Sequence, residues 1–152
     1  MYLVLNLGLK SIRAIIFDES GSIVANAQQP LRTSLNEGRV EQSPEEWWSR
    51  GLEVIREACS NDIIKESVRY MTVTASSCCL ISVNGDGGVL HEAIMVSDKR
   101  AQKEASFIST LQSYRDLRKI RADYSVSSSL MLPKILWLKK NKPNLFDDAK
   151  YF

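Results

Sequence analysis

Hydrophobic and polar positions alternate in short blocks over the opening part of the chain. Two apolar runs, Tyr2–Leu7 and Ile12–Phe17, are each about one strand long and rich in leucine, valine and isoleucine. A short polar turn, Asn6–Ser11, joins them and contains a single glycine. A second turn, Asp18–Gly21, leads to a third apolar run, Ile23–Ala27. The pattern predicts three antiparallel strands, and the first turn can point backbone N–H groups at a bound anion.

A helical pattern begins after residue 43. Ser43 is a good N-cap, Pro44 suits the first helical position, and Glu46 can complete a capping box. Apolar residues follow at helical spacing: Trp47, Trp48, Leu52, Ile55 and Ala58. We therefore expect a helix of about four turns that ends near Ser60. The polar segment before it, Pro30–Gly38, predicts an irregular loop.

The rest of the chain alternates short β-like runs with helices. The predicted elements are strands over Arg69–Ala75 and Leu80–Val83, a hairpin turn at Asn84–Gly88, a short edge at Ala93–Val96, a helix over Lys99–Leu111 capped by Ser97-Asp98, a helix from about Ser127–Ser129 that Pro143 ends, and a start of a further helix at Leu145. This order is neither a strict βαβ alternation nor all-β. It favours a mixed sheet with helices.

Composition limits the function classes without choosing one. The 152 residues suit one domain, and a net charge of +2 without a basic block gives no sign of a nucleic acid or membrane partner. Three cysteines, Cys59, Cys78 and Cys79, lack zinc-ligand or thioredoxin spacing, so we expect reduced thiols in a cytoplasmic protein. No apolar run approaches the ~20 residues of a membrane span, and the N-terminus does not resemble a secretory signal.

The opening segment resembles the start of the FGGY carbohydrate kinases, members of the actin-like and ribonuclease-H-like ATPase superfamily. That family typically opens with Asp-x-Gly-Thr-x-Ser-x-Lys/Arg. The same spacing holds here, but Asn6 stands for the aspartate and Leu9 for the threonine. Three further segments are similar to family motifs in the same order: Gly38–Trp48, Ala93–Ala101 and Leu132–Pro143. The resemblance extends over nearly the whole chain, with the four motifs spaced as in the family.

The resemblance implies an α/β fold of the ribonuclease-H-like class, a mixed sheet with an antiparallel N-terminal meander and flanking helices. It implies that residues 1–152 are the N-terminal domain of a two-domain kinase that transfers the γ-phosphate of ATP to a hydroxyl of a small sugar or polyol. ATP and Mg²⁺ would be the cofactors. The catalytic base would lie beyond residue 152, which would leave this chain inactive alone. The oligomeric state stays open, with a homodimer among the options.

The glycine turn is the candidate phosphate site. The resemblance implies that Asn6, Gly8, Lys10 and Ser11 face the ATP phosphates. They would offer N–H donors, a hydroxyl and a cation. Asn6 would also be the metal ligand, although an amide lacks the negative charge that favours Mg²⁺. Taken without the resemblance, the same turn is also an ordinary hairpin turn.

The candidate sugar site lies further along the chain. Ser76, Ser77 and Cys78 stand where the family often carries a Gly-Gln-Met-His-Gly-like segment, and Asp98 and Arg100 keep its Asp-x-Arg pair. The resemblance implies that these side chains contact sugar hydroxyls. The residues alone also allow Asp98 to be a helix cap and Arg100 to form a surface ion pair.

Two other functions remain open from the sequence. Asn6 and Leu9 suggest a degenerate kinase that senses a sugar or nucleotide without turnover. An actin-like assembly ATPase is less favoured, because the Trp-Trp helix and the Asp-x-Arg segment belong to the sugar-kinase pattern.

Overall fold

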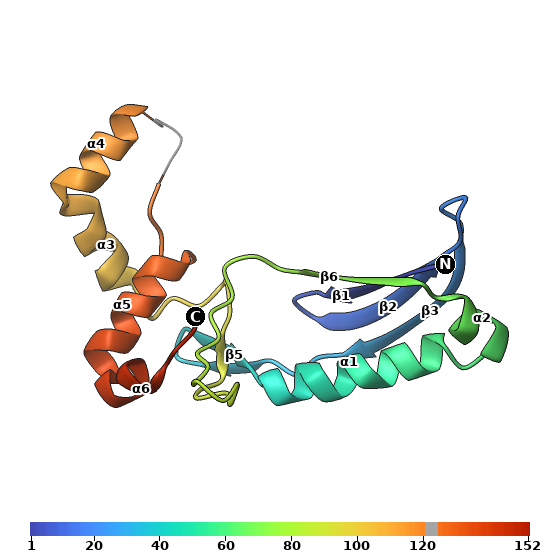
Figure 1. Ribbon diagram of the computed structural model, residues 1–152. Coiled ribbons are helices and arrows are strands. Elements are labelled where there is room, and N and C mark those ends of the chain that lie inside the picture. The colour runs from blue at the N-terminus through green and yellow to red at the C-terminus, as the bar shows by residue number, and fades with distance from the viewer. Residues whose placement is uncertain (121–124) are drawn as a thin grey trace. The chain divides into compact units, whose positions relative to one another are not determined.

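The chain folds as two compact units, shown in the computed structural model of Figure 1, which describes residues 1–120 and 125–152. Residues Met1–Thr33 and Ser43–Ser77 form the first unit. Residues Ser34–Gln42 and Cys78–Phe152 form the second. Each unit contains its own sheet.

The first unit is built on a four-stranded mixed sheet in the order β3-β2-β1-β6. Its strands are β1 (Tyr2–Leu7), β2 (Ser11–Phe17), β3 (Ile23–Pro30) and β6 (Tyr70–Ala75). The first three strands pair antiparallel, and β6 runs parallel to β1. The predicted N-terminal meander and the mixed sheet are therefore confirmed.

Helix α1 (Pro44–Ala58) packs along one face of this sheet. A Cβ added to Gly51 would lie 3.4 Å from Ile12 Cδ1 and 3.8 Å from Leu5 Cδ2, so these side chains point at the helix. The Ser43 cap is confirmed, because its Oγ accepts a hydrogen bond from the Glu46 amide at 3.3 Å. The return half of the capping box is wrong: the Glu46 carboxylate accepts from the Arg32 amide instead.

A second helix of this unit was not predicted. Helix α2 (Asp62–Ser67) is a short helix whose Asn61 cap accepts from the amides of Ile63 and Ile64. It buries none of its residues, so it lacks the apolar periodicity that would have indicated it.

The second unit contains a small sheet in the order β4-β5-β7. The strands are β4 (Ser34–Asn36), β5 (Arg39–Gln42) and β7 (Ala93–Ile94). Between β4 and β5, Glu37 and Gly38 adopt φ of 47° and 81°, which closes a tight hairpin. The prediction of an irregular loop over Pro30–Gly38 is therefore wrong, because an exposed hairpin shows no apolar alternation.

The predicted strand over Leu80–Val83 is replaced by isolated bridges. Leu80 pairs with Ile94, and Val83 pairs with Val89 and with Tyr151. The turn that follows is confirmed: the Asn84 amide donates to the Gly88 carbonyl at 2.9 Å. The Asn84 side chain accepts from the Gly88 amide at 2.7 Å.

Four helices follow in the described part of the second unit. They are α3 (Gln102–Thr110), α4 (Gln112–Ile120), α5 (Met131–Asn141) and α6 (Pro143–Asp148). The prediction that Ser97-Asp98 caps a helix from Lys99 is wrong. Helix α3 starts after Ala101 without a side-chain cap, since the Asp98 carboxylate is used elsewhere. Helix α4 was not predicted. Helix α5 ends at Asn141, just before Pro143, which is the first residue of α6.

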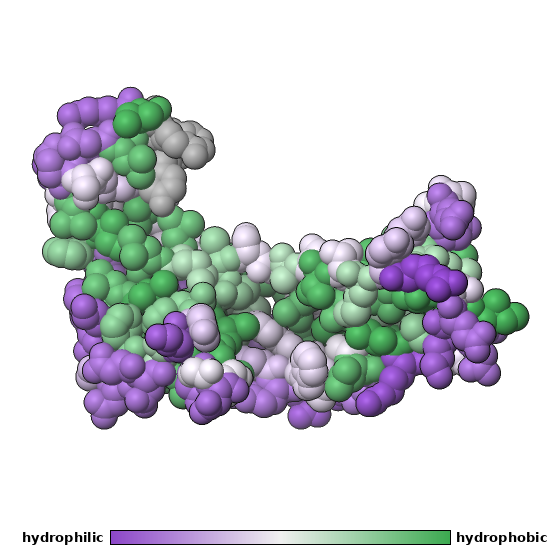
Figure 2. Space-filling view, viewed as in Figure 1, coloured by the Kyte–Doolittle hydropathy of each residue, from purple (hydrophilic) through white to green (hydrophobic). Residues whose placement is uncertain are grey.

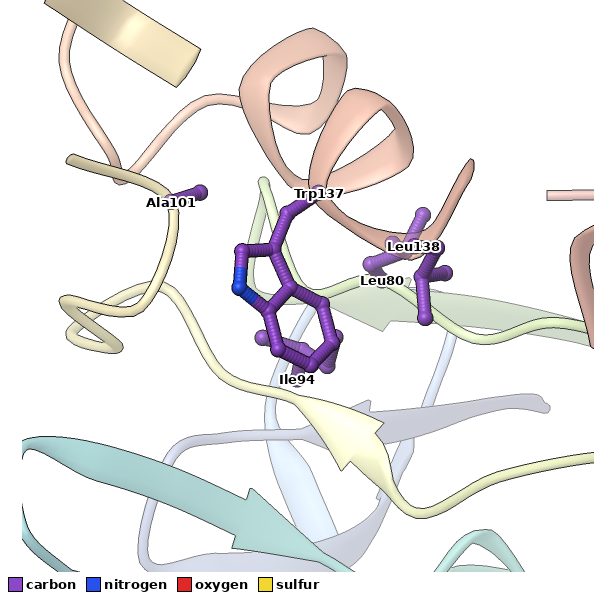
Figure 3. Close-up of a cluster of buried hydrophobic side chains, with 5 residues drawn as sticks. All are labelled: Leu80, Ile94, Ala101, Trp137 and Leu138. Carbon is purple, nitrogen blue, oxygen red and sulfur yellow. The ribbon is translucent and has the colours of Figure 1, made fainter. Parts of the chain in front are cut away.

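Trp137 of α5 lies at the centre of the core of the second unit. Its indole packs among Leu80, Ile94, Ala101 and Leu138 (Figure 3). Apolar side chains also remain on the surface of the α3–α5 helices, among them Phe107, Leu111 and Leu132 (Figure 2). None of the described helices is both long enough and apolar enough to cross a bilayer.

Candidate functional site

The turn between β1 and β2 is tight and glycine-dependent. The Gly8 amide donates to the Ser11 carbonyl at 3.0 Å. A Cβ at Gly8 would lie only 3.1 Å from that oxygen. Leu9 is 45% exposed, Lys10 is exposed and Ser11 is buried. The turn is thus held from inside by its own backbone, and its outer rim faces solvent.

The C-terminal end of β6 lies beside this turn. Because β1 and β6 are parallel, their carboxyl ends meet at one edge of the sheet, where ligands of open α/β sheets commonly bind. The Ser76 amide donates to the Leu7 carbonyl at 3.1 Å. The fold therefore brings Ser76, and next to it Ser77, to the same edge as Gly8, from about 70 residues away in the sequence.

A polar row crosses the sheet face opposite α1. Asn6 pairs with Arg13 on β2 and with Thr74 on β6, and paired residues project to the same face. Leu5, the residue before Asn6, points at α1, so this row points away from the helix. A cation, an amide and a hydroxyl thus lie side by side below the turn.

Arg13 and Thr74 were not among the predicted site residues. A signal for Thr74 was present: in Tyr70–Ala75, threonines alternate with Met71 and Val73, as expected for a strand with two different faces. The signal did not say which strand would lie beside β1. Only the parallel pairing places Thr74 next to Asn6.

The residues around the turn fit a phosphate better than a bare metal ion. Across the described residues, no group of three or more His, Cys, Asp or Glu side chains gathers closely enough to hold a metal. Asn6 supplies one neutral oxygen. Mg²⁺ keeps several waters and is usually bound through substrate phosphates, so it would fit here as a phosphate-bound ion with Asn6 as one contact.

The candidate sugar residues of the second unit form a buried polar network. The Asp98 carboxylate accepts from the Val40 amide at 2.6 Å, from the Arg100 amide at 2.9 Å, and from Arg100 Nε and Nη2 at 2.9 and 2.8 Å. Arg100 Nη2 also donates to Glu41 Oε1 at 2.7 Å, and its guanidinium lies 5.1 Å from the Trp137 ring centre. Asp98 is only 1% exposed.

This network favours the charged forms of both partners. Burial alone would raise the pKa of Asp98, but hydrogen bonds from the Arg100 side chain and from the Val40 and Arg100 amides hold this pKa below its ordinary 3.8. Burial would lower the pKa of Arg100, and its bonds to Asp98 and Glu41 raise it instead. Direct sugar contact by Asp98 and Arg100 stays a prediction. Their observed partners are each other, Val40 and Glu41.

Cys78 occupies an unusual turn. Its φ is 63°, in the left-handed region that non-glycine residues seldom adopt, and its side chain is half-buried. The three cysteines are free thiols, as expected. Cys78 belongs to the same unit as Asp98 and Arg100, whereas Ser76 and Ser77 belong to the unit that carries the Gly8 turn.

Relatives among known proteins include kinases that are named for glycerol and for xylulose. The chain is 31% identical over 151 residues to a glycerol kinase from Polaromonas sp., covering 97% of this chain and 30% of that protein. It is 25% identical to a xylulose kinase from Staphylococcus epidermidis, covering 97% of this chain and 29% of that protein. The chain thus spans about 30% of the length of the curated relatives that it matches.

Solved structures show the same fold. A xyloylose kinase from Brucella ovis matches with a TM-score of 0.89 at 22% identity, over 98% of this chain and 31% of that one. A xylulose kinase from Rhodospirillum rubrum matches with a TM-score of 0.85 at 24% identity, over 97% of this chain and 30% of that one. Both confirm the expected ribonuclease-H-like α/β fold.

The family itself is settled by the whole-chain match. Residues 1–152 match the model of the N-terminal domain of the FGGY family of carbohydrate kinases. The four sequence motifs, the meander and the sheet topology agree with that match. The chain therefore belongs to the FGGY family of carbohydrate kinases.

Proposed function

We propose that this chain is the N-terminal part of an ATP-dependent kinase that phosphorylates a hydroxyl of a small sugar or polyol. The observation that carries the proposal is the Gly8 turn at the carboxyl end of β1, beside the end of the parallel strand β6. The chain's membership in the FGGY family of carbohydrate kinases supplies the reaction class. Because the chain spans about 30% of its relatives, the catalytic base and a second domain belong to the proposal.

The turn would hold the nucleotide phosphates. Gly8 allows the close approach of backbone that a phosphate needs, and Lys10 brings a cation to the exposed rim. Asn6 would contact a phosphate-bound Mg²⁺. Mg²⁺ neutralises charge on the phosphates during transfer. Ser11 and Arg13 would add a hydroxyl and a second positive charge to this side.

In the first unit, Ser76 and Ser77 at the carboxyl end of β6 would contact the acceptor. In the second unit, Cys78, Asp98 and Arg100 stay predicted acceptor residues. Glycerol and xylulose are the acceptors to test first, because relatives are named for them. The two serine hydroxyls can donate to and accept from sugar hydroxyls. The Asp98–Arg100 ion pair would also act on the acceptor indirectly, because Asp98 holds the backbone amide of Val40 in place.

The test is a coupled assay of ADP formation by the full-length protein with ATP, Mg²⁺ and either glycerol or xylulose. Asn6→Asp, Leu9→Thr and the double variant are compared with wild type. Restoring the carboxylate should raise kcat/KM about tenfold or more, since one well-placed electrostatic group contributes that much to transition-state stabilisation. Asn26→Asp on β3 is the matched control, because it adds the same charge to the same sheet away from the turn.

The outcomes separate the kinase from the sensing module that the sequence left open. Phosphorylation by wild type supports the kinase. Nucleotide binding without turnover, with turnover appearing only in the double variant, would favour the sensing module. Absence of both nucleotide binding and turnover in every variant would reject the proposal.

A further inference from the structure

Lys134 is a fully buried lysine, and among the described residues no carboxylate is one of its hydrogen-bond partners. It lies in the first turn of α5 and is 0% exposed. Its Nζ donates to the Cys78 carbonyl at 2.5 Å and to the Ser129 carbonyl at 3.1 Å. Lysines are rarely buried to this degree without an anionic partner, so this ammonium group needs an explanation.

The surroundings of Lys134 are polar but do not neutralise it. Burial lowers the pKa of Lys134, and the nearby groups of Cys79, Asp98 and Cys78 oppose this shift only in part. Its two observed acceptors are backbone oxygens. A lysine that only filled space in the core would make no such hydrogen bonds, whereas this one joins α5 to a turn 56 residues earlier.

The turn that it contacts is strained. Cys78 has a φ of 63°, and non-glycine residues persist there only when their surroundings hold them. On the C-terminal side, the bridge between Leu80 and Ile94 fixes the chain, with both N···O distances at 2.9 Å. The hydrogen bond from Lys134 reaches the carbonyl of the strained residue itself. The lysine and the bridge thus hold Cys78 from two directions.

We propose that Lys134 is a positioning residue for the acceptor: its ammonium fixes the left-handed backbone at Cys78 and thereby sets the affinity for the sugar or polyol. The inference rests on the proposed function, since it takes Cys78 as part of the acceptor site. It goes beyond that function by assigning a role to a buried residue that need not touch either substrate.

The first experiment measures steady-state kinetics of the full-length protein with ATP and with glycerol or xylulose. Lys134→Met removes both hydrogen bonds and keeps a long unbranched side chain. We expect the acceptor KM to rise about tenfold, while kcat and the KM for ATP change less than about twofold. Lys139→Met, an exposed position on the same helix, is the matched control and should change neither KM.

A glycine at position 78 tests the backbone mechanism directly. Glycine adopts a positive φ without strain, so a glycine at position 78 depends less on the hydrogen bond from Lys134. Relative to Cys78→Gly alone, the double variant Lys134→Met with Cys78→Gly should lose less than about threefold in acceptor KM. Equal losses in both backgrounds, or equal rises in the KM for acceptor and for ATP, would overturn the proposal.

A thiol measurement separates failure of this inference from failure of the kinase function. Alkylation of Cys78 by iodoacetamide, followed by peptide mass spectrometry with Cys59 as internal reference, needs no substrate. Lys134→Met should raise the Cys78 to Cys59 rate ratio severalfold, because a released turn exposes its thiol more often. A raised ratio in a protein without turnover supports the positioning role of Lys134 and rejects the kinase function. An unchanged ratio rejects the positioning role of Lys134.

Folding is checked by circular dichroism before either experiment. If Lys134→Met does not fold, Lys134→Gln is the second variant, since its amide keeps a neutral donor. It should shift the acceptor KM and the thiol ratio in the same direction by a smaller factor. If Lys134→Gln is also unfolded, Lys134 is a general folding residue and the positioning role is wrong.

Discussion

Polar groups are exposed at the Gly8 turn of the first unit and buried around Asp98 in the second unit. In the first, the turn of Gly8 is stabilised by its own backbone, and Lys10 remains exposed at its rim. In the second, Asp98 and Arg100 are buried and hydrogen-bonded to each other and to their neighbours. Exposed polar groups on a rigid turn are available to a ligand, whereas buried and mutually satisfied ones mainly maintain a structure. The comparison predicts that substitutions in the Gly8 turn change binding and that substitutions in the Asp98–Arg100 pair change stability.

The largest effect is expected from Asp98→Ala. It would leave the buried Arg100 with Glu41 as its remaining carboxylate partner and the Val40 amide without its acceptor. Breaking a buried pair in this way typically costs about 3–5 kcal/mol of the free energy of unfolding. Urea denaturation followed by circular dichroism measures it. Asp116→Ala on the exposed surface of α4 is the control and should leave stability nearly unchanged. A similarly small effect at Asp98 would remove the contrast between the units.

The acid dependence of stability sharpens the same contrast. The pKa of Asp98 is lower in the folded protein than its ordinary 3.8, so its contribution is complete above pH 3.8. The contribution is lost as the pH falls through the folded pKa. The stability difference between wild type and Asp98→Asn should therefore shrink below pH 3.8, by at most about 1.4 kcal/mol per pH unit. Urea titrations at several pH values between 5 and 2.5 give the difference. A constant difference would mean that Asp98 is not held as a carboxylate.

A loss of nucleotide binding is expected from Gly8→Ala. The added Cβ would lie 3.1 Å from the Ser11 carbonyl, so the turn must shift by a few tenths of an ångström. We expect the Kd for ATP of the full-length protein to rise about thirtyfold, or about 2 kcal/mol, because a displaced turn loses its aligned N–H donors. Isothermal titration calorimetry measures it.

A second glycine supplies the control for that variant. Gly85 also lies in a hairpin turn, but a Cβ there would meet nothing within 4 Å. Gly85→Ala should leave the ATP affinity unchanged. An equal loss of affinity in both variants would show that turn glycines matter here for folding in general, and the first unit would lose its distinct role.

The sequence predicted those parts of the fold that depend on local signals. The meander follows from apolar alternation and two turns, and α1 follows from the Ser43 cap and its helical spacing. The hairpin of β4 and β5 was missed, because its strands carry few apolar residues and β5 pairs on its other side with β7, about 50 residues later. Local patterns cannot show a pairing of that kind.

The candidate site follows the same rule. The Gly8 turn was predicted because its residues are adjacent in the sequence. The role of Asp98 as the acceptor for the Val40 amide was not, since the two are 58 residues apart. Lys134 was missed as well: in a helix of mixed apolar and basic residues, nothing local marks one lysine as buried. Burial by residues that are distant in the sequence, rather than residue type, decides which charged groups stabilise the fold.

The smallest effect is expected from Lys10→Met. An exposed lysine contributes little, about 0.2–1 kcal/mol, because solvent and salt screen its charge. The KM for ATP should therefore rise about 1.4- to fivefold at low ionic strength and approach that of wild type near 0.5 M salt. Lys65→Met, an exposed lysine on α2 of the same unit, should show no such salt-dependent change. A large rise in the KM for ATP of Lys10→Met that persists in high salt would mean that the nucleotide binds and desolvates the Lys10 ammonium directly. The exposed Gly8 turn would then resemble the buried network of the second unit.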